Sequence, residues 1–112
     1  MTRNKYGNKP LIIGSERYSS QREAKRHQDL LLMQRAGLIA AVVREVPFVL
    51  AVGVKIEGEK RARPALRYFV DFLYSTAEGK LVAEDAKGVQ TPLYRAKKHL
   101  MATVHGIHVR EV

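Results

Sequence analysis

Two helix starts, one towards each end of the chain, bracket a middle that is rich in β-branched and aromatic residues. Ser20 followed by Glu23 forms the S-x-x-E capping box, in which each side chain satisfies a backbone N–H at the start of a helix. Thr91 followed by Pro92 places an N-cap residue before a proline at the first helical position. We therefore expect two helices, over residues 20–36 and 91–105, closed by Gly37 and Gly106.

Strand composition fills most of the remaining chain. The expected strands are residues 42–54, 67–74, 81–86 and 107–112. The first of these segments forms either one strand or two short ones around Pro47. A highly charged segment with a central glycine, residues 55–63, reads as an exposed hairpin tip or loop. The segments 67–74 and 81–86 should be hairpin neighbours. The order helix, three strands, helix, strand predicts an α/β (α+β) fold with a mixed sheet flanked by helices.

Composition indicates one globular domain over residues 1–112, in which residues 1–10 form a basic, flexible arm. The absence of cysteine excludes disulfides, thiolate zinc sites and cysteine nucleophiles. The apolar stretches are too short to span a bilayer, so we expect a soluble, intracellular protein. The net charge of +9 predicts a polyanionic partner, with nucleic acid, an anionic membrane and an acidic protein all open on charge alone.

One acidic residue stands out inside an apolar strand. Asp71 lies within Tyr68-Phe-Val-Asp-Phe-Leu-Tyr74, where a carboxylate is costly unless a partner compensates it. In the next strand, alternation puts Asp85 and Lys87 on one face and Glu84 on the other. Neighbouring strands would then bring two carboxylates and one ammonium to a single place.

That set suits hydrolysis of a phosphodiester. Two carboxylates hold Mg²⁺ (or Mn²⁺), which favours deprotonation of a bound water and neutralises charge on the phosphate oxygens. The predicted catalytic residues are Asp71, Asp85 and Lys87, with Lys87 orienting water or stabilising the transition state. The plainer alternative, a surface salt bridge between Asp85 and Lys87, leaves Asp71 unexplained.

The same residues carry a family resemblance. Asp71 followed by Asp85-Ala-Lys87 resembles the D…(D/E)-x-K signature of the PD-(D/E)XK nuclease superfamily, with Val70 in place of the usual proline. Four segments in order are similar to an uncharacterised phage and prophage family placed in that superfamily: Asn4-Lys-Tyr-Gly-Asn-Lys-Pro10, Glu23-Ala-Lys-Arg26, Tyr68-Phe-Val-Asp-Phe72 and Glu84-Asp-Ala-Lys-Gly88. The resemblance implies a restriction-endonuclease-like α-β-β-β-α-β core and a magnesium-dependent endonuclease acting on structured or phage DNA. It also implies a cytoplasmic location in a bacterial or phage-infected cell.

Two further carboxylates are candidate metal ligands beside Asp71 and Asp85. Glu23 has two equally weighted interpretations, as the capping partner of Ser20 or as a helix-borne ligand of the kind this superfamily often adds. Glu84 replaces Asp85 if the strand register differs from the expected one.

Basic side chains on both helices and in the charged loop are candidate phosphate contacts. They are Arg22, Lys25, Arg26, Lys60, Arg61, Arg63, Lys97 and Lys98. We expect them to recognise the shape of DNA rather than its base sequence, because no base-reading helix is evident. A homodimer would place two sites on two strands. The competing hypotheses are a non-catalytic nucleic-acid-binding protein on the same fold and a basic accessory protein that binds an acidic partner.

Overall fold

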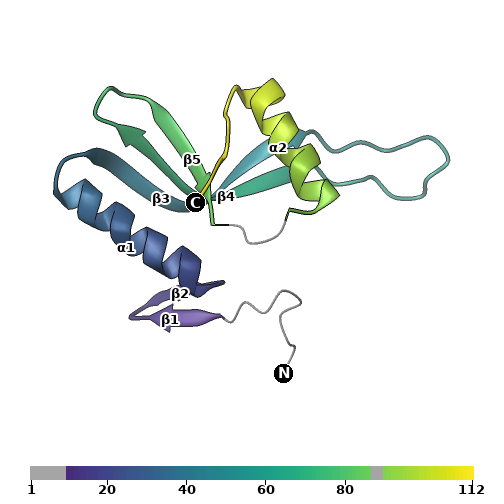
Figure 1. Ribbon diagram of the computed structural model, residues 1–112. Coiled ribbons are helices and arrows are strands. Elements are labelled where there is room, and N and C mark those ends of the chain that lie inside the picture. Colours follow the sequence, from purple (N-terminus) through teal and green to yellow (C-terminus); the bar gives the residue numbers. More distant parts are fainter. Residues whose placement is uncertain (1–9, 87–89) are drawn as a thin grey trace.

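A computed structural model of the protein describes residues 10–86 and 90–112. The elements follow the expected order after an additional N-terminal hairpin (Figure 1). They are β1 (Leu11–Ile13), β2 (Glu16–Tyr18), α1 (Gln21–Arg35), β3 (Ile39–Ala51), β4 (Leu66–Thr76), β5 (Leu81–Asp85), α2 (Pro92–His105) and β6 (Arg110–Glu111). The chain is therefore a mixed α/β protein with two helices and a mixed sheet in its described part, which confirms the predicted class.

Both helices begin where their capping residues predict. The Ser20 hydroxyl accepts a hydrogen bond from the Glu23 N–H at 3.1 Å, and the Thr91 hydroxyl accepts one from the Tyr94 N–H at 3.0 Å. Gly106 ends α2 in the left-handed conformation, with φ of 67°, which glycine adopts without steric cost. Local sequence chemistry thus determines both ends of α2.

The four-stranded sheet has the order β3-β4-β5-β6. β4 pairs antiparallel with β3 and with β5, which confirms the predicted hairpin, whereas β5 and β6 run parallel across the α2 crossover. The final strand is shorter than the predicted 107–112, because only residues 110 and 111 find partners before β5 ends at Asp85. In Figure 1, α1 lies beside one half of the β3–β4 pair and α2 crosses the other half, so the end of β5 falls between the helices.

The β1–β2 hairpin was not predicted, although its turn carries a signal. Gly14, with φ of 61°, and Ser15 separate two short apolar or mixed segments, a combination typical of tight hairpins. Tyr18 at its end is buried, and the hairpin contacts α1. Residues 1–9 of the predicted flexible arm lie outside the described residues.

Two buried clusters stabilise the fold, and β4 contributes to both. Its buried residues alternate along the strand, with Tyr68 and Val70 packing against α2 residues Tyr94 and Met101. The other cluster combines Phe72 and Tyr74 with Leu30, Ile39 and Val82. Asp71 therefore lies at the junction between the two clusters.

Candidate functional site

The carboxylates of Asp71 and Asp85 meet where the backbone pairing of β4 and β5 stops. The last backbone pair is Phe72 opposite Glu84. Beyond it, the Asp71 N–H donates to Asp85 Oδ1 at 2.9 Å, and the Ala86 N–H donates to Asp71 Oδ2 at 2.8 Å. Each carboxylate thus accepts a backbone N–H of the opposite strand. The structure places these two predicted site residues together, as the sequence pattern predicts.

Asp85 is completely buried, with an exposed fraction of 0%. Its second oxygen, Oδ2, accepts a hydrogen bond from the Tyr68 hydroxyl. Burial, and then the hydrogen bond to Asp85, raise the pKa of Tyr68 well above its ordinary value, so Tyr68 remains a neutral donor. Within residues 10–86 and 90–112, no lysine, arginine or histidine forms an ion pair with Asp85. A buried carboxylate without a cation is energetically costly.

Glu84 is also buried, but it is compensated. Arg26 of α1 binds it with two parallel hydrogen bonds, from Nε to Oε1 at 2.8 Å and from a terminal nitrogen to Oε2 at 2.7 Å. The Tyr74 hydroxyl donates to the same Oε2. The hydrogen bond to Glu84 raises the pKa of Arg26 above its ordinary value. With both oxygens bound, Glu84 belongs to a structural ion pair rather than to the aspartate pair.

Glu23 is held in the cap of α1. Its Oε2 accepts hydrogen bonds from the Ser19 N–H at 2.8 Å and from the Ser19 hydroxyl at 2.6 Å, and its Oε1 lies 3.5 Å from a terminal nitrogen of Arg44. Of the two interpretations of Glu23, these contacts favour the cap. The described part of the chain contains no group of three or more His, Asp or Glu side chains arranged to hold a metal. The four predicted ligands Asp71, Asp85, Glu23 and Glu84 therefore do not form one cluster there.

The donor chemistry of the aspartate pair nevertheless fits a hard divalent cation. Each carboxylate oxygen has two acceptor positions. Contacts within residues 10–86 and 90–112 use one of these positions on each Asp85 oxygen. Two carboxylates are the number that a protein commonly supplies to Mg²⁺, whose remaining positions are taken by water and substrate phosphate.

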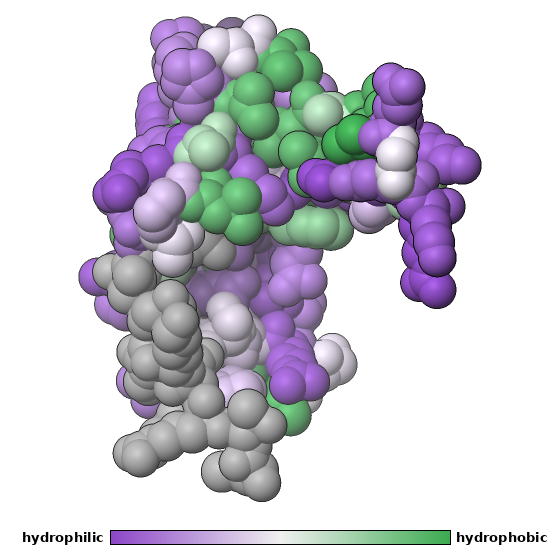
Figure 2. Space-filling view, turned by 90° about the vertical axis from the view of Figure 1, so that its right-hand side faces the viewer, coloured by the Kyte–Doolittle hydropathy of each residue, from purple (hydrophilic) through white to green (hydrophobic). Residues whose placement is uncertain are grey.

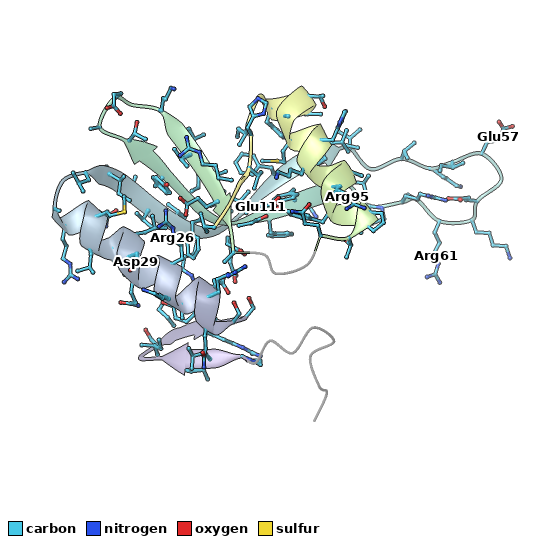
Figure 3. The ribbon with its side chains drawn as sticks, in the orientation of Figure 1. Arg26, Asp29, Glu57, Arg61, Arg95 and Glu111 are labelled. Carbon is cyan, nitrogen blue, oxygen red and sulfur yellow. The ribbon has the colours of Figure 1, made fainter. Side chains whose placement is uncertain are left out.

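The predicted basic residues fall into two groups. In the first group, four residues pair with carboxylates: Lys25 with Asp29 at 3.8 Å, Arg26 with Glu84 at 2.7 Å, Arg63 with Glu59 at 2.7 Å, and Lys98 with Glu111 at 2.5 Å. The second group is described by position alone: Arg22, Lys60 and Arg61 are exposed, while Lys97 is half-buried on α2. Arg22, Lys25 and Arg26 line a shallow depression of about 350 Å³ together with Asp29 and Val112. Figure 3 shows Arg26 and Asp29 on α1 and Arg61 on the distant hairpin.

Lys87, the third predicted catalytic residue, lies outside the described residues. Its assignment therefore still rests on the spacing Asp85-Ala86-Lys87. β5 ends two residues earlier, between the two helices (Figure 1).

Sequence reasoning missed Tyr68 as a partner of Asp85. Alternation assigns Tyr68 and Asp71 to opposite faces of β4, so the strand pattern gave no reason to group them. The available signal was a buried hydroxyl, because a buried tyrosine O–H usually finds an acceptor.

The fold and the aspartate pair define a mixed α/β protein with a candidate divalent-cation site at the end of two adjacent strands. The chain belongs to the family described as "Protein of unknown function (DUF1064)", whose family model matches residues 3–110. Searches of curated proteins and of solved structures give no match. No helix in the described ranges has the length and apolar composition needed to cross a membrane.

Proposed function

We propose that this protein is a metal-dependent nuclease that hydrolyses DNA phosphodiester bonds as an endonuclease. The observation that carries the proposal is the meeting of Asp71 with a fully buried Asp85. Neighbouring carboxylates repel each other when they are ionised, and a divalent cation bound by both would offset that repulsion. The resemblance to the PD-(D/E)XK superfamily and the strongly basic chain support DNA as the substrate.

In this proposal, Asp71 and Asp85 hold Mg²⁺ or Mn²⁺. The bound ion lowers the pKa of water and neutralises charge that develops on the phosphate. Tyr68 and the Asp71 N–H fix the orientation of the Asp85 carboxylate, so the ligand does not have to be ordered when the substrate binds. Lys87, two residues beyond Asp85, is assigned to orient the attacking water or to stabilise the phosphate charge.

A plasmid-nicking assay with Mg²⁺ or Mn²⁺ tests this function. The substitutions are Asp71→Asn, Asp85→Asn and Lys87→Ala. Asparagine removes the charge and keeps one acceptor oxygen for the N–H of the opposite strand. At Asp85 the amide nitrogen then faces Tyr68, whose hydroxyl can accept a hydrogen bond instead of donating one. Each aspartate substitution should reduce cleavage by at least about 100-fold, because even residues that only support a metal ligand cost about 10–100-fold.

Glu78→Gln is the matched control, since Glu78 is an exposed carboxylate in the β4–β5 turn. It should cleave like the wild type. Cleavage that survives both aspartate substitutions would exclude this site. Salt-sensitive DNA binding without any cleavage would instead favour the non-catalytic nucleic-acid-binding protein.

A further inference from the structure

Residues 52–64, here called the projecting hairpin, extend away from the sheet between β3 and β4 (Figure 1). Two backbone hydrogen bonds join Val54 and Arg63, at 3.0 and 2.7 Å, and the Glu59 N–H donates to the Ile56 carbonyl at 3.0 Å across the tip. Gly58 has φ of 89°, a left-handed conformation that suits glycine in a tight turn. The segment is thus a hairpin loop closed by one isolated antiparallel bridge between Val54 and Arg63.

The side chains of the projecting hairpin contribute little to the fold. All of its residues except the half-buried Glu59 are exposed. Three aliphatic side chains face solvent, with exposed fractions of 79% for Val52, 53% for Val54 and 41% for Ile56. Packing within the chain does not account for them. Exposed apolar residues grouped on one extension are typical of a surface that contacts another molecule.

Charge selects the kind of partner. The projecting hairpin contains four basic residues and two acidic ones; the basic residues are Lys55, Lys60, Arg61 and Arg63. One acid, Glu59, is bound to Arg63. The projecting hairpin is net positive on a chain of net charge +9, so it complements a polyanion and repels a second copy of the same chain.

The hairpin also presents its cations on a particular side. In Figure 3, Arg61 points towards the side of the molecule on which β1, β2 and the start of α1 lie, whereas Glu57 points the opposite way. In Figure 2, the side of the molecule from which the hairpin extends faces the viewer. The exposed residues Arg22 and Lys25 are on the first two turns of α1. Arg22 and Lys25 line the depression that also includes Val112, and the Val112 N–H donates to the carbonyl of Asp85 at the end of β5.

We infer that the projecting hairpin lies in a groove of double-stranded DNA and holds the duplex across the Asp71–Asp85 site. The inference rests on the proposed function for the position of the cut. The major groove accepts two antiparallel backbone segments side by side, and the two sides of the hairpin are held in that way at Val54 and Arg63. In the groove, lysine and arginine reach phosphates, and aliphatic groups meet thymine methyls. A single strand has no such groove, so the substrate class is duplex DNA.

Binding is measured by fluorescence anisotropy, with a labelled duplex and a single strand of equal length. All proteins carry Asp71→Asn, so that no DNA is cut. The test variant adds Lys60→Ala and Arg61→Ala, and the control adds Arg35→Ala and Lys80→Ala. The control removes the same charge from two exposed residues at the end of α1 and in the β4–β5 turn, remote from the hairpin in Figure 1.

The test variant should bind the duplex several-fold more weakly than the control, and the slope of log K against log salt should fall by about 2. Binding of the single strand should change no more than in the control. Equal duplex binding by both variants would overturn the inference, as would equal losses on duplex and single strand. A shift from dimer to monomer in light scattering, with unchanged DNA binding, would identify the hairpin as a contact between two copies instead.

The two proposals fail in distinguishable ways. If the wild type never cleaves DNA but the test variant still loses duplex binding selectively, the nuclease proposal fails and the groove contact stands. If cleavage depends on Asp71 and Asp85 but duplex binding is insensitive to Lys60 and Arg61, the nuclease proposal stands and the groove contact fails.

Discussion

Glu84 and Asp85 are adjacent in β5, and both are buried carboxylates, yet they lie in opposite kinds of environment. Glu84 is clamped by Arg26 and by the Tyr74 hydroxyl. Asp85 accepts hydrogen bonds from the Asp71 N–H and from the Tyr68 hydroxyl. It also lies beside another acidic residue, Asp71. Fold stability explains the first arrangement, because the charge of Glu84 is matched at its own oxygens.

Fold stability alone explains the second arrangement poorly. Neutral donors orient a carboxylate without cancelling its charge, and the approach of two carboxylates costs further free energy. Proteins keep such strain at sites where a ligand relieves it. The contrast between neighbouring residues therefore assigns a structural role to Glu84 and motivates the functional role that we propose for Asp85.

The largest expected effect is on stability, and it has opposite signs at the two positions. In EDTA, Glu84→Gln should lower the free energy of unfolding by about 2–3 kcal/mol, because it leaves the partly buried Arg26 without its counter-charge. Asp85→Asn should leave stability unchanged or raise it. The repulsion from Asp71 is removed, the remaining oxygen accepts the Asp71 N–H, and the Tyr68 hydroxyl can accept from the new amide N–H. Urea denaturation measures both. If Asp85→Asn destabilises the protein as much as Glu84→Gln does, Asp85 has a structural role like that of Glu84.

A smaller effect is expected when single hydroxyl groups are removed. Tyr68→Phe should weaken binding of Mn²⁺ about tenfold in calorimetric titration, because the hydroxyl that orients Asp85 is lost. Tyr74→Phe is its matched control, since it removes the equivalent hydroxyl from Glu84. Equal losses in the two variants would show that the hydroxyls act on the fold and not on the ion.

The smallest effect is a pH dependence that arises on the α1 side. His27 is hydrogen-bonded to Tyr18 at 2.6 Å and stacked on Phe72. Burial, and then the positive charge of Arg44, lower the pKa of His27 from its ordinary value of 6.5. The unfolded chain thus takes up a proton at a higher pH than the folded one, so stability is full above pH 6.5 and falls as the pH falls below it.

Thermal melts at pH 7.5 and pH 5.5 measure this dependence. His27→Gln should reduce the loss of stability between the two pH values. An identical pH dependence in the wild type and in His27→Gln would show that other groups carry it.

Much of this architecture could be predicted because its signals are local. The cap at Thr91 and the left-handed glycine at Gly106 define α2 residue by residue, and alternation correctly placed Glu84 and Asp85 apart. The β1–β2 hairpin was missed because its strands have only three residues each, too few to show a period. Its contact with the sheet, where Arg44 of β3 binds Glu16 and lies over the Tyr18 ring, joins residues that no local pattern connects.

The sequence pattern could predict that Asp71 and Asp85 lie on neighbouring strands, but not which groups they bind. Asp71 and Asp85 each accept a backbone N–H of the opposite strand because the hydrogen-bonded pairing of β4 and β5 stops at Phe72 and Glu84. Where that pairing stops is a property of the assembled sheet. The partners of Glu23 and Arg26 depend in the same way on how α1 lies against the sheet. Long-range pairing of charges is therefore the part that sequence patterns left open.

Because β4 contributes to both buried clusters, the aspartate pair depends on the packing of each cluster. Val70 belongs to one cluster and Phe72 to the other, with Asp71 between them. If either half of the molecule opened locally, the strand that carries Asp71 would lose half of its anchorage and the pair would separate. Amides around Asp71 should accordingly exchange with deuterium no more slowly than those of the less stable half, because the site exists only while both halves are closed.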